Sequence, residues 1–588
     1  MIHSEPFIQV QSLSYQPIGA DKIILKDINL EIFPNDFVLL LGPPGCGKSM
    51  LTRCFNGIIP QLDEGEMQGS VLVEGKDTRT SNMYEFATKI GMVFQNPDDQ
   101  IVSLIVLDEV AWGVENLGLT HEEIKKRVFK FMDLLNITHL KDRLTFAISG
   151  GQKQKVSIAS NLAMLQDVLM LDDPTTDLDP VCKMEVVQAL KQLHQEMGKT
   201  LIVIEHDLSD LIEMANRIIL MDEGRIVRDN TPDELVTNHY EDLIRLGVNI
   251  PQHVEIAHEV LNLSGENQLC PTNKEKAFSV LSNYVQQQKI PVKIKGVEKR
   301  STKKVVISAH NLEFSYQPKL PILKGINFDI YQGEFVAIVG ANGSGKSTLV
   351  NNFTGLLIPD KGKLTINGQD TNQKKISELA HDIGYVFQNP DHQLFANTVA
   401  DEVGFSLKLQ NISQEEIDHR ITETLEIVQL EHLRDRHPFS LSRGQRQKLA
   451  VATALIHQPS VILLDEPTTG QDRHSLSGLL KLMVRLNRQG NTTIMITHDM
   501  DIVAAYATRM LVMVDGQIVL DGAPIDVFYE NFDTLSQLNL RPPTVIDFCR
   551  RLGKEVIPPC LTVEELVNFL GGENQVKIKS IIDPTKHS

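Results

Sequence analysis

The 588-residue chain lacks the features that mark several classes of protein. Its six cysteines form no CxxC pair and no cluster with histidine, which argues against a zinc or iron–sulfur site and against a disulfide framework. No apolar run approaches the roughly 20 residues that span a bilayer. The first residues lack a basic segment followed by an apolar stretch, so no secretory signal is expected. These absences favour a cytoplasmic protein with reduced thiols.

Basic residues are also in deficit. The chain has 57 Lys and Arg against 76 Asp and Glu, and its formal net charge is −19. Such a surface repels nucleic-acid phosphates and anionic lipid headgroups, so no nucleic-acid partner is expected. The hydrophobic share of 42% is ordinary for a globular protein, and the length is too great for a single core.

Present instead is a repeat that covers most of the chain. Four motifs occur twice in the same order, as GPPGCGKS (42–49) and GANGSGKS (340–347), VFQNPDDQ (93–100) and VFQNPDHQ (386–393), LMLDDPTT (169–176) and ILLDEPTT (462–469), and IVIEHD (202–207) and IMITHD (494–499). The nearly constant separation indicates two homologous domains, which we place at 1–286 and 306–588. The polar, basic stretch 287–305 is predicted to be the linker.

The apolar runs that end at these motifs predict the fold class. FVLLLG, VLMLDD and TLIVIEHD in the first half are short and unalternating, which is typical of parallel strands buried on both faces. Amphipathic segments such as 121–135 predict intervening helices. We expect an α/β fold with two tandem phosphate-loop domains, each with a helical subdomain.

GxxxxGK[ST] after a strand predicts a phosphate-binding loop, because its glycines let backbone N–H groups turn toward phosphate oxygens at a helix N-terminus. The lysines reach the outer phosphates and the following hydroxyls hold Mg²⁺. ATP and Mg²⁺ are therefore the expected cofactors. The predicted residues are Gly42, Gly45, Gly47, Lys48 and Ser49 in the first half, and Gly340, Gly343, Gly345, Lys346, Ser347 and Thr348 in the second.

Carboxylates at strand ends form the second part of each predicted site. Asp172 and Asp465 are expected to bind Mg²⁺, although a lone aspartate there often caps a helix. The next residue, Asp173 or Glu466, is predicted to be the base that polarises the attacking water. Because aspartate is one methylene shorter, and a displacement of about 1 Å costs on the order of 100-fold in rate, the first half is predicted to be catalytically weakened.

Six further residues are assigned to the nucleotide. Gln95 and Gln388 follow strands and are expected to contact Mg²⁺ or the water, while His206 and His498 are expected to bond the γ-phosphate and join the catalytic set. Tyr15 and Tyr316, in LSYQP and FSYQP, are candidates to stack on adenine, with a core position as the alternative.

With ISGGQ at 148–152 and LSRGQ at 441–445, the motif order resembles the nucleotide-binding domain of ATP-binding cassette (ABC) proteins. The stretches 94–118 and 387–410, with NPD and a DEVAWG-like segment, are similar to the ATPases of energy-coupling factor (ECF) transporters. The segments around Pro251 and Pro543 are similar to the helical tails of those ATPases, which implies a C-terminal helical appendage in each half. The resemblance also implies a transmembrane T component and a membrane S component that binds a vitamin or a transition-metal ion. It also implies basic coupling helices, with Asp98, Asp99 and Asp391 as candidate acceptors or, alternatively, as helix caps.

The ABC resemblance implies that the halves pair head to tail. Each phosphate loop then faces the signature segment of the other half, which is 148–152 or 441–445. One site then contains Ser442, Arg443, Gly444 and Gln445 and the other contains Ser149, Gly150, Gly151 and Gln152. Asp173 and Arg443 both fall in the first site. Arg443 either crowds the γ-phosphate, which would hinder closure, or supplies a guanidinium that could hold ATP. We therefore expect the first site mainly to hold ATP and the second, with Glu466, to hydrolyse it. The alternative is that Asp173 serves as a slower base.

The sequence therefore predicts an ATPase that drives an ECF-type importer and lies at the cytoplasmic face of the membrane, bound through its membrane partners. A soluble tandem ABC protein acting on ribosomes or nucleic acid is the alternative, and the strong negative charge argues against it.

Overall fold

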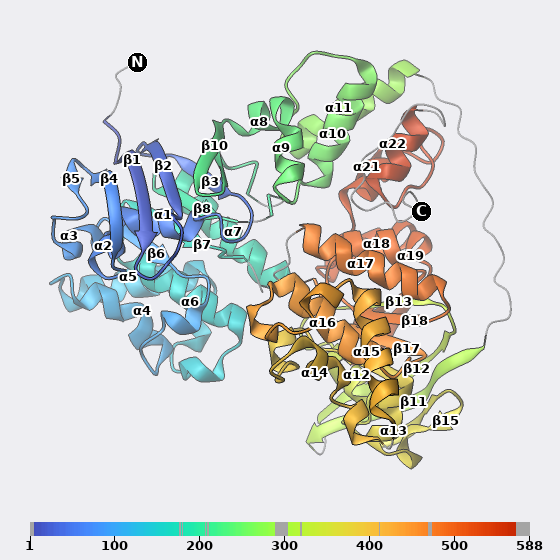
Figure 1. The fold of residues 1–588 in the computed structure, drawn as a ribbon. Coiled ribbons are helices and arrows are strands. Elements are labelled where there is room, and N and C mark those ends of the chain that lie inside the picture. Colours follow the sequence, from blue (N-terminus) through green and yellow to red (C-terminus); the bar gives the residue numbers. More distant parts are fainter. Residues whose placement is uncertain are drawn as a thin grey trace. The chain divides into compact units, whose positions relative to one another are not determined.

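The computed structural model describes residues 5–175, 178, 180–205, 207–208, 211–288, 304–317, 320–410, 412–468 and 473–571. The chain divides into two compact units, residues 1–281 and 282–588 (Figure 1). The division falls inside a helix, so the boundaries at 286 and 306 remain predictions. Of the predicted linker, only residues 287–288 and 304–305 are among those described.

A parallel sheet forms the centre of the first unit. Its described strands lie in the order β10-β9-β3-β8-β7-β6, and β10 alone of these runs antiparallel to its neighbour. They are β3 (Phe37–Leu41), β6 (Ile90–Val93), β7 (Val168–Asp172), β8 (Thr200–Ile204), β9 (Arg217–Asp222) and β10 (Arg225–Asn230). Every residue of β3, β7 and β8 is buried, as expected for strands covered on both faces. The predicted α/β class is confirmed.

A second, antiparallel sheet lies beside the first. It has the order β2-β1-β4-β5, with β1 (Ile8–Pro17), β2 (Leu25–Ile32), β4 (Gly65–Val73) and β5 (Lys76–Asp77). One hydrophobic core joins this sheet to the parallel sheet and to the helix after β3, with Leu13, Val38 and Leu51 among its members. The core therefore fixes the loop between β3 and that helix from both sides.

The helices of the first unit fall into two groups. α1 (Lys48–Phe55), α2 (Ile58–Gln61), α3 (Met83–Ala87) and α7 (Pro180–Gln195) accompany the sheets, whereas α4 (Val106–Glu115), α5 (His121–Leu134) and α6 (Gly150–Ala163) lie between β6 and β7 in the chain. Thr120 caps α5 and Ser149 caps α6 through side-chain oxygens that accept a backbone N–H, which fixes where each helix begins. These three helices are the predicted helical subdomain (Figure 1).

Four helices follow β10 and form the predicted appendage of the first unit. They are α8 (Pro232–Asn238), α9 (Tyr240–Arg245), α10 (Gln252–Ser264) and α11 (Lys274–Gln288). α10 buries one face, including Val254 and Ala257, and ends at Gly265, whose φ of 67° is the left-handed conformation that closes a helix.

The second unit repeats this plan. Its described strands form a sheet in the order β16-β17-β18-β13-β19-β20 and an antiparallel sheet in the order β12-β11-β14-β15. The strands are β11 (Val305–Gln317), β12 (Leu320–Tyr331), β13 (Phe335–Val339), β14 (Lys361–Ile366), β15 (Gln369–Asp370), β16 (Ile383–Val386), β17 (Val461–Asp465), β18 (Thr492–Ile496), β19 (Arg509–Val514) and β20 (Gln517–Gly522).

The helices of the second unit correspond in the same way. Around its sheets are α12 (Lys346–Phe353), α13 (Ile376–Asp382), α17 (Arg473–Arg488) and α18 (Met500–Tyr506); the helical subdomain has α14 (Val399–Gly404), α15 (Gln414–Val428) and α16 (Arg443–Leu455); the appendage has α19 (Pro524–Glu530), α20 (Phe532–Gln537), α21 (Thr544–Leu552) and α22 (Val563–Gly571). In the part of the chain that the structure describes, no helix is long and apolar enough to cross a membrane.

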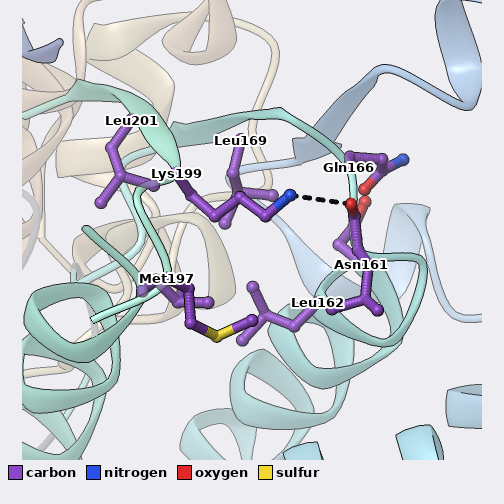
Figure 2. A pocket seen from close by; sticks show the side chains of 9 residues that line it. Asn161, Leu162, Gln166, Leu169, Met197, Lys199 and Leu201 are labelled. Atoms are coloured by element: carbon purple, nitrogen blue, oxygen red, sulfur yellow. Dashed lines mark hydrogen bonds between the residues drawn. The ribbon is translucent and has the colours of Figure 1, made fainter. Parts of the chain in front are cut away.

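Figure 2 shows a pocket of the first unit that lies at the start of strands β7 and β8, between α6 and α7. Leu162, Leu169 and Leu201 line it, and Lys199 Nζ donates to the carbonyl of Leu165 at 3.0 Å across its rim. Its volume of about 10 Å³ holds no more than a water molecule. It lies at the opposite end of these strands from Asp172, so it is not part of the predicted ATP site.

Candidate functional site

The first phosphate loop connects β3 to α1. Gly45 and Gly47 have φ angles of 77° and 108°, and a Cβ at Gly42 would lie 2.2 Å from the carbonyl oxygen of Met221. Glycine is therefore required where the loop turns and where it passes β9. Lys48, the first residue of α1, is 6% exposed, and its Nζ donates to the carbonyls of Gly42 at 2.7 Å and Pro43 at 3.1 Å. The loop is thus folded around the lysine.

The second loop has the same geometry between β13 and α12. Gly343 and Gly345 have φ angles of 81° and 100°, and a Cβ at Gly340 would lie 2.3 Å from the carbonyl oxygen of Met513. Lys346 Nζ donates to Gly340 at 2.7 Å and to Ala341 at 3.0 Å. Both loops therefore present a buried ammonium and a helix N-terminus, an arrangement suited to phosphate.

Carboxylates lie beside both loops. Asp172, at the end of β7, accepts a hydrogen bond from the hydroxyl of Ser49; burial raises the pKa of Asp172, and this bond and nearby Lys48 oppose the shift. In the second unit, Tyr385 Oη donates to Asp465 at 3.1 Å, and burial raises the pKa of Asp465. A hydroxyl and a carboxylate at one place are the hard oxygen ligands that Mg²⁺ prefers, so the donor set fits this ion.

Two predicted catalytic residues, Glu466 and His498, and the predicted Mg²⁺ ligand Gln388 come together in the second unit. Gln388 Nε2 donates to Glu466 Oε2 at 3.0 Å, and His498 Nδ1 lies 3.8 Å from Glu466 Oε1. The neighbouring His498 imidazole lowers the pKa of Glu466, and the Glu466 carboxylate raises the pKa of His498. Glu466 is therefore ionised at neutral pH and able to accept a proton from water.

The first unit keeps the backbone of this turn and changes its side chains. The amide of Asp173 donates to Ile204 at 3.0 Å and that of Glu466 to Ile496 at 2.9 Å, with φ angles of 47° and 42°. Asp173 is 6% exposed, and Gln95 is exposed, as is Gln388 in the second unit. His206, the remaining predicted catalytic residue, lies outside the described residues.

The signature segments begin helices α6 and α16. Ser149 Oγ accepts from the amide of Gln152 at 3.3 Å while Gln152 Oε1 accepts from the amide of Ser149 at 3.0 Å. Ser442 and Gln445 form the same capping box at 3.3 Å and 2.9 Å. A Cβ at Gly150 would meet no atom within 4 Å, so arginine at the equivalent position 443 needs no local rearrangement.

Comparison with known proteins places the two units in one family. The ABC transporter family profile matches residues 25–176 and 323–469, which contain both phosphate loops and both strand-end carboxylates. The chain belongs to the ABC transporter family. An ABC transporter ATP-binding protein of Methanosarcina mazei is 39% identical over 590 residues, covering 97% of this chain and 98% of that protein. Such proteins are ATPases, and this chain is an ATPase with two ABC domains.

One further similar sequence and one similar solved structure were found. YkoD of Bacillus subtilis, which is named as an HMP/thiamine import ATP-binding protein, is 35% identical over 548 residues and covers 92% of this chain and 96% of its own length. The solved structure of CbiO1 from Clostridium perfringens, part of the ABC transporter complex CbiONQ, is 38% identical with a TM-score of 0.37; it covers 41% of this chain and 97% of its own.

The register of the strands corrects one predicted nucleotide contact. Tyr15 pairs with Leu25 in the first ABC domain, and Phe314, not Tyr316, pairs with the equivalent Leu323 in the second. Tyr15 is 1% exposed, and its Oη donates to the carbonyl of Asp63 at 3.0 Å. Its ring lies in the core and has no face free for adenine. The letters SYQP thus align two positions that are not structurally equivalent.

Tyr316 has the surroundings that the prediction requires. It is 60% exposed, its ring packs edge-on against Phe314, and its Oη lies 3.4 Å from Oγ1 of Thr348 in the second phosphate-loop helix. Counted from Tyr15, the residue equivalent to Tyr316 in the first domain is Pro17, which is followed by exposed Ile18. An aromatic platform therefore stands beside the second loop, where the first domain has aliphatic residues.

Sequence reasoning missed Glu205, which lies between β8 and His206. It is 2% exposed, and its Oε1 accepts from both the amide of Thr175 at 3.2 Å and its hydroxyl at 2.7 Å. One sequence signal was available: IVIEHD has a glutamate where IMITHD has a threonine, directly after a strand predicted to be buried. A glutamate at such a position is expected to have a specific partner, because glutamate is rarely buried without one.

Proposed function

We propose that the chain is the motor subunit of an ECF-type importer, with one hydrolysing and one ATP-holding site. The observation that carries this proposal is the contrast between Glu466, bonded to Gln388 and near His498, and the shorter, buried Asp173. In each site the backbone N–H groups of the loop and the lysine bind the phosphates, and Glu466 takes the proton of the attacking water in the second.

We assign the Mg²⁺ ligands by their oxygen chemistry. Ser49 and Asp172 would hold the ion in the first site, and Ser347 and Asp465 in the second, with Gln95 and Gln388 as further ligands. When bound, the ion neutralises phosphate charge. Head-to-tail pairing, by which Ser442–Gln445 completes the first site and Ser149–Gln152 the second, is part of the proposal and follows from the family resemblance.

The surface formed by the segments after Gln95 and Gln388 supports docking to a membrane partner. Glu109 is 4% exposed and its carboxylate accepts from the amides of Val102 at 2.9 Å and Ser103 at 2.7 Å, which fixes the segment after NPD. Glu402 does the same for the second domain through Phe395 and Ala396. Large apolar side chains are nevertheless exposed around these segments: Val102, Leu104, Trp112 and Phe146 in the first domain and Phe395, Phe405 and Phe439 in the second. A rigid segment with exposed apolar side chains is typical of an interaction site.

The aspartates predicted to accept coupling-helix arginines already have partners within the chain. Lys153 Nζ lies 2.5 Å from Asp98, and Arg446 Nε lies 2.6 Å from Asp391. Neither aspartate is the helix cap, since Asn96 and Asn389 accept the capping amides. An arginine of a partner would therefore share or replace an existing ion pair, while Asp99 is a further candidate acceptor.

The similarity to YkoD, which is named for HMP/thiamine import, supports a small organic solute as the cargo class, with a transition-metal ion as the other class that the resemblance allows. T and S components would then hold this chain at the cytoplasmic face of the membrane. The test is purification of the tagged full chain from mildly solubilised membranes. Recovery with a transmembrane protein, a small membrane protein and a bound solute supports the proposal; recovery with ribosomes or nucleic acid contradicts it.

A further inference from the structure

The first ABC domain contains a buried glutamate, with two partly exposed charged neighbours, that the proposed reaction does not use. Glu205 accepts two hydrogen bonds from Thr175, and Lys183 of α7 and Asp207 lie close enough to influence its charge. Lys183 Nζ also lies 3.5 Å from Asp207 Oδ2. The cluster thus connects three elements: the turn after β7, the segment after β8 and helix α7.

At the described positions equivalent to Glu205 and Lys183, the second ABC domain has no charged residue. Thr497 stands where the first domain has Glu205, and its Oγ1 accepts from the amide of Asp499 at 3.0 Å. Leu476, packed against the hydrophobic core, stands where the first domain has Lys183. The carboxylate and the lysine are therefore both specific to the domain that carries Asp173.

The position of Glu205 relates it to two predicted ATP-contacting segments. Glu205 immediately precedes His206, and its partner Thr175 lies two residues after Asp173. Asp173 and Glu466 have similar φ angles, 47° and 42°, so this conformation does not depend on Glu205. The two bonds from Thr175 to the buried carboxylate join the turn after β7 to the segment after β8.

The charge of Glu205 is poised to change near neutral pH. Burial raises its pKa to about 7; Lys183 and the bonds from Thr175 oppose the shift, and Asp207 adds to it. Further titratable residues in the sequence of these segments include Asp172, Asp173, Asp177, Asp179, Cys182 and His206. ATP brings several negative charges to the adjacent phosphate loop, and a nearby negative charge favours the neutral form of a carboxyl group.

We infer that Glu205 is a positioning residue of the first ATP site, which holds the turn after β7 against the segment after β8 and takes up a proton when ATP binds. The inference rests on the proposed role of Lys48 and Asp173 in that site. It is independent of the transported solute and of the membrane partners.

The test measures ATP binding by the first site alone. In the full chain with Lys346→Ala, which disables the second phosphate loop, the dissociation constant for Mg-ATP is measured from pH 6 to pH 8. The dissociation constant should fall between pH 8 and pH 6. This fall should be at least about threefold larger with Glu205 present than in the same chain with Glu205→Gln. ATP itself and His206 titrate in this range, so the decisive quantity is the difference between the two chains at each pH.

Further variants separate positioning from fold support. Glu205→Asp should retain part of the pH dependence, whereas Glu185→Gln, a charge-neutralising change on the helix that carries Lys183 and outside the cluster, should leave it intact. Thermal unfolding is recorded in parallel, because a purely structural role would shift the melting temperature without changing the pH profile. Identical pH profiles for Glu205 and Glu205→Gln overturn the inference alone; failure of the Lys346→Ala chain to bind ATP overturns the proposed first site with it.

Discussion

The first and second ABC domains have the same backbone and different chemistry. Both bend the chain into left-handed conformations at the phosphate-loop glycines and at the residue after the strand-end aspartate. The second domain lines this frame with Tyr316, Glu466 and His498, whereas the first has Pro17 and Asp173 at the first two of these positions. A backbone cradle is sufficient to hold a nucleotide, but hydrolysis needs a carboxylate of the right length. The comparison shows that the loop and turn backbone is shared, while the carboxylate proposed as the base is one methylene shorter in the first domain.

The largest expected effect concerns the two candidate bases. Glu466→Gln should lower the steady-state ATPase rate by about 100-fold or more, because it removes the proposed general base and the charge that Gln388 and His498 face. Asp173→Asn should change the rate less than about threefold. Phosphate release by the full chain with its membrane partners measures both. Equal losses would remove the proposed asymmetry, and a several-fold gain from Asp173→Glu would favour Asp173 as a slower base.

A smaller effect is expected at the adenine platform. In a Lys48→Ala chain, which reports on the second loop, Tyr316→Ala should weaken ATP binding about tenfold, since stacking of a base on an aromatic ring contributes about 1–3 kcal/mol. Tyr15→Phe in the Lys346→Ala chain should leave affinity unchanged and cost about 1 kcal/mol of stability through loss of the hydroxyl's bond to Asp63. Calorimetric titration and thermal unfolding measure the two quantities. Weaker binding by Tyr15→Phe would restore Tyr15 to the nucleotide site.

The smallest expected effect lies in the signature segments. Arg443→Gly should speed nucleotide release from the first site by about threefold if the guanidinium attracts the phosphates, because an exposed charge pair contributes less than about 1 kcal/mol. The reciprocal Gly150→Arg should slow release from the second site, with no change in melting temperature, since a Cβ at Gly150 meets no atom within 4 Å. Stopped-flow release of a fluorescent ATP analogue provides the measurement. Slower release by Arg443→Gly would show that Arg443 crowds the site instead.

Much of the fold was predictable because the relevant signals are local. Unalternating apolar runs such as FVLLL predicted parallel strands, and the helical subdomains lie where the sequence between VFQNP and the signature predicts them. The alignment of Tyr15 with Tyr316 was wrong because the match of four letters outweighed the register of the strands, which depends on long-range pairing with Leu25 and Leu323. Glu205 escaped notice because a single glutamate beside a motif histidine carries no periodic or spacing signal.

The sequence by itself determined the family, the two-domain plan and the position of each phosphate loop, because glycine, lysine and strand-end carboxylates act within a few residues of one another. The tertiary structure decided which tyrosine is buried, which glutamine reaches Glu466 and which carboxylate is enclosed beside Asp173. Those outcomes depend on strand pairing and burial among residues distant in the chain, and the free energy of a buried charge is set by all of its neighbours together.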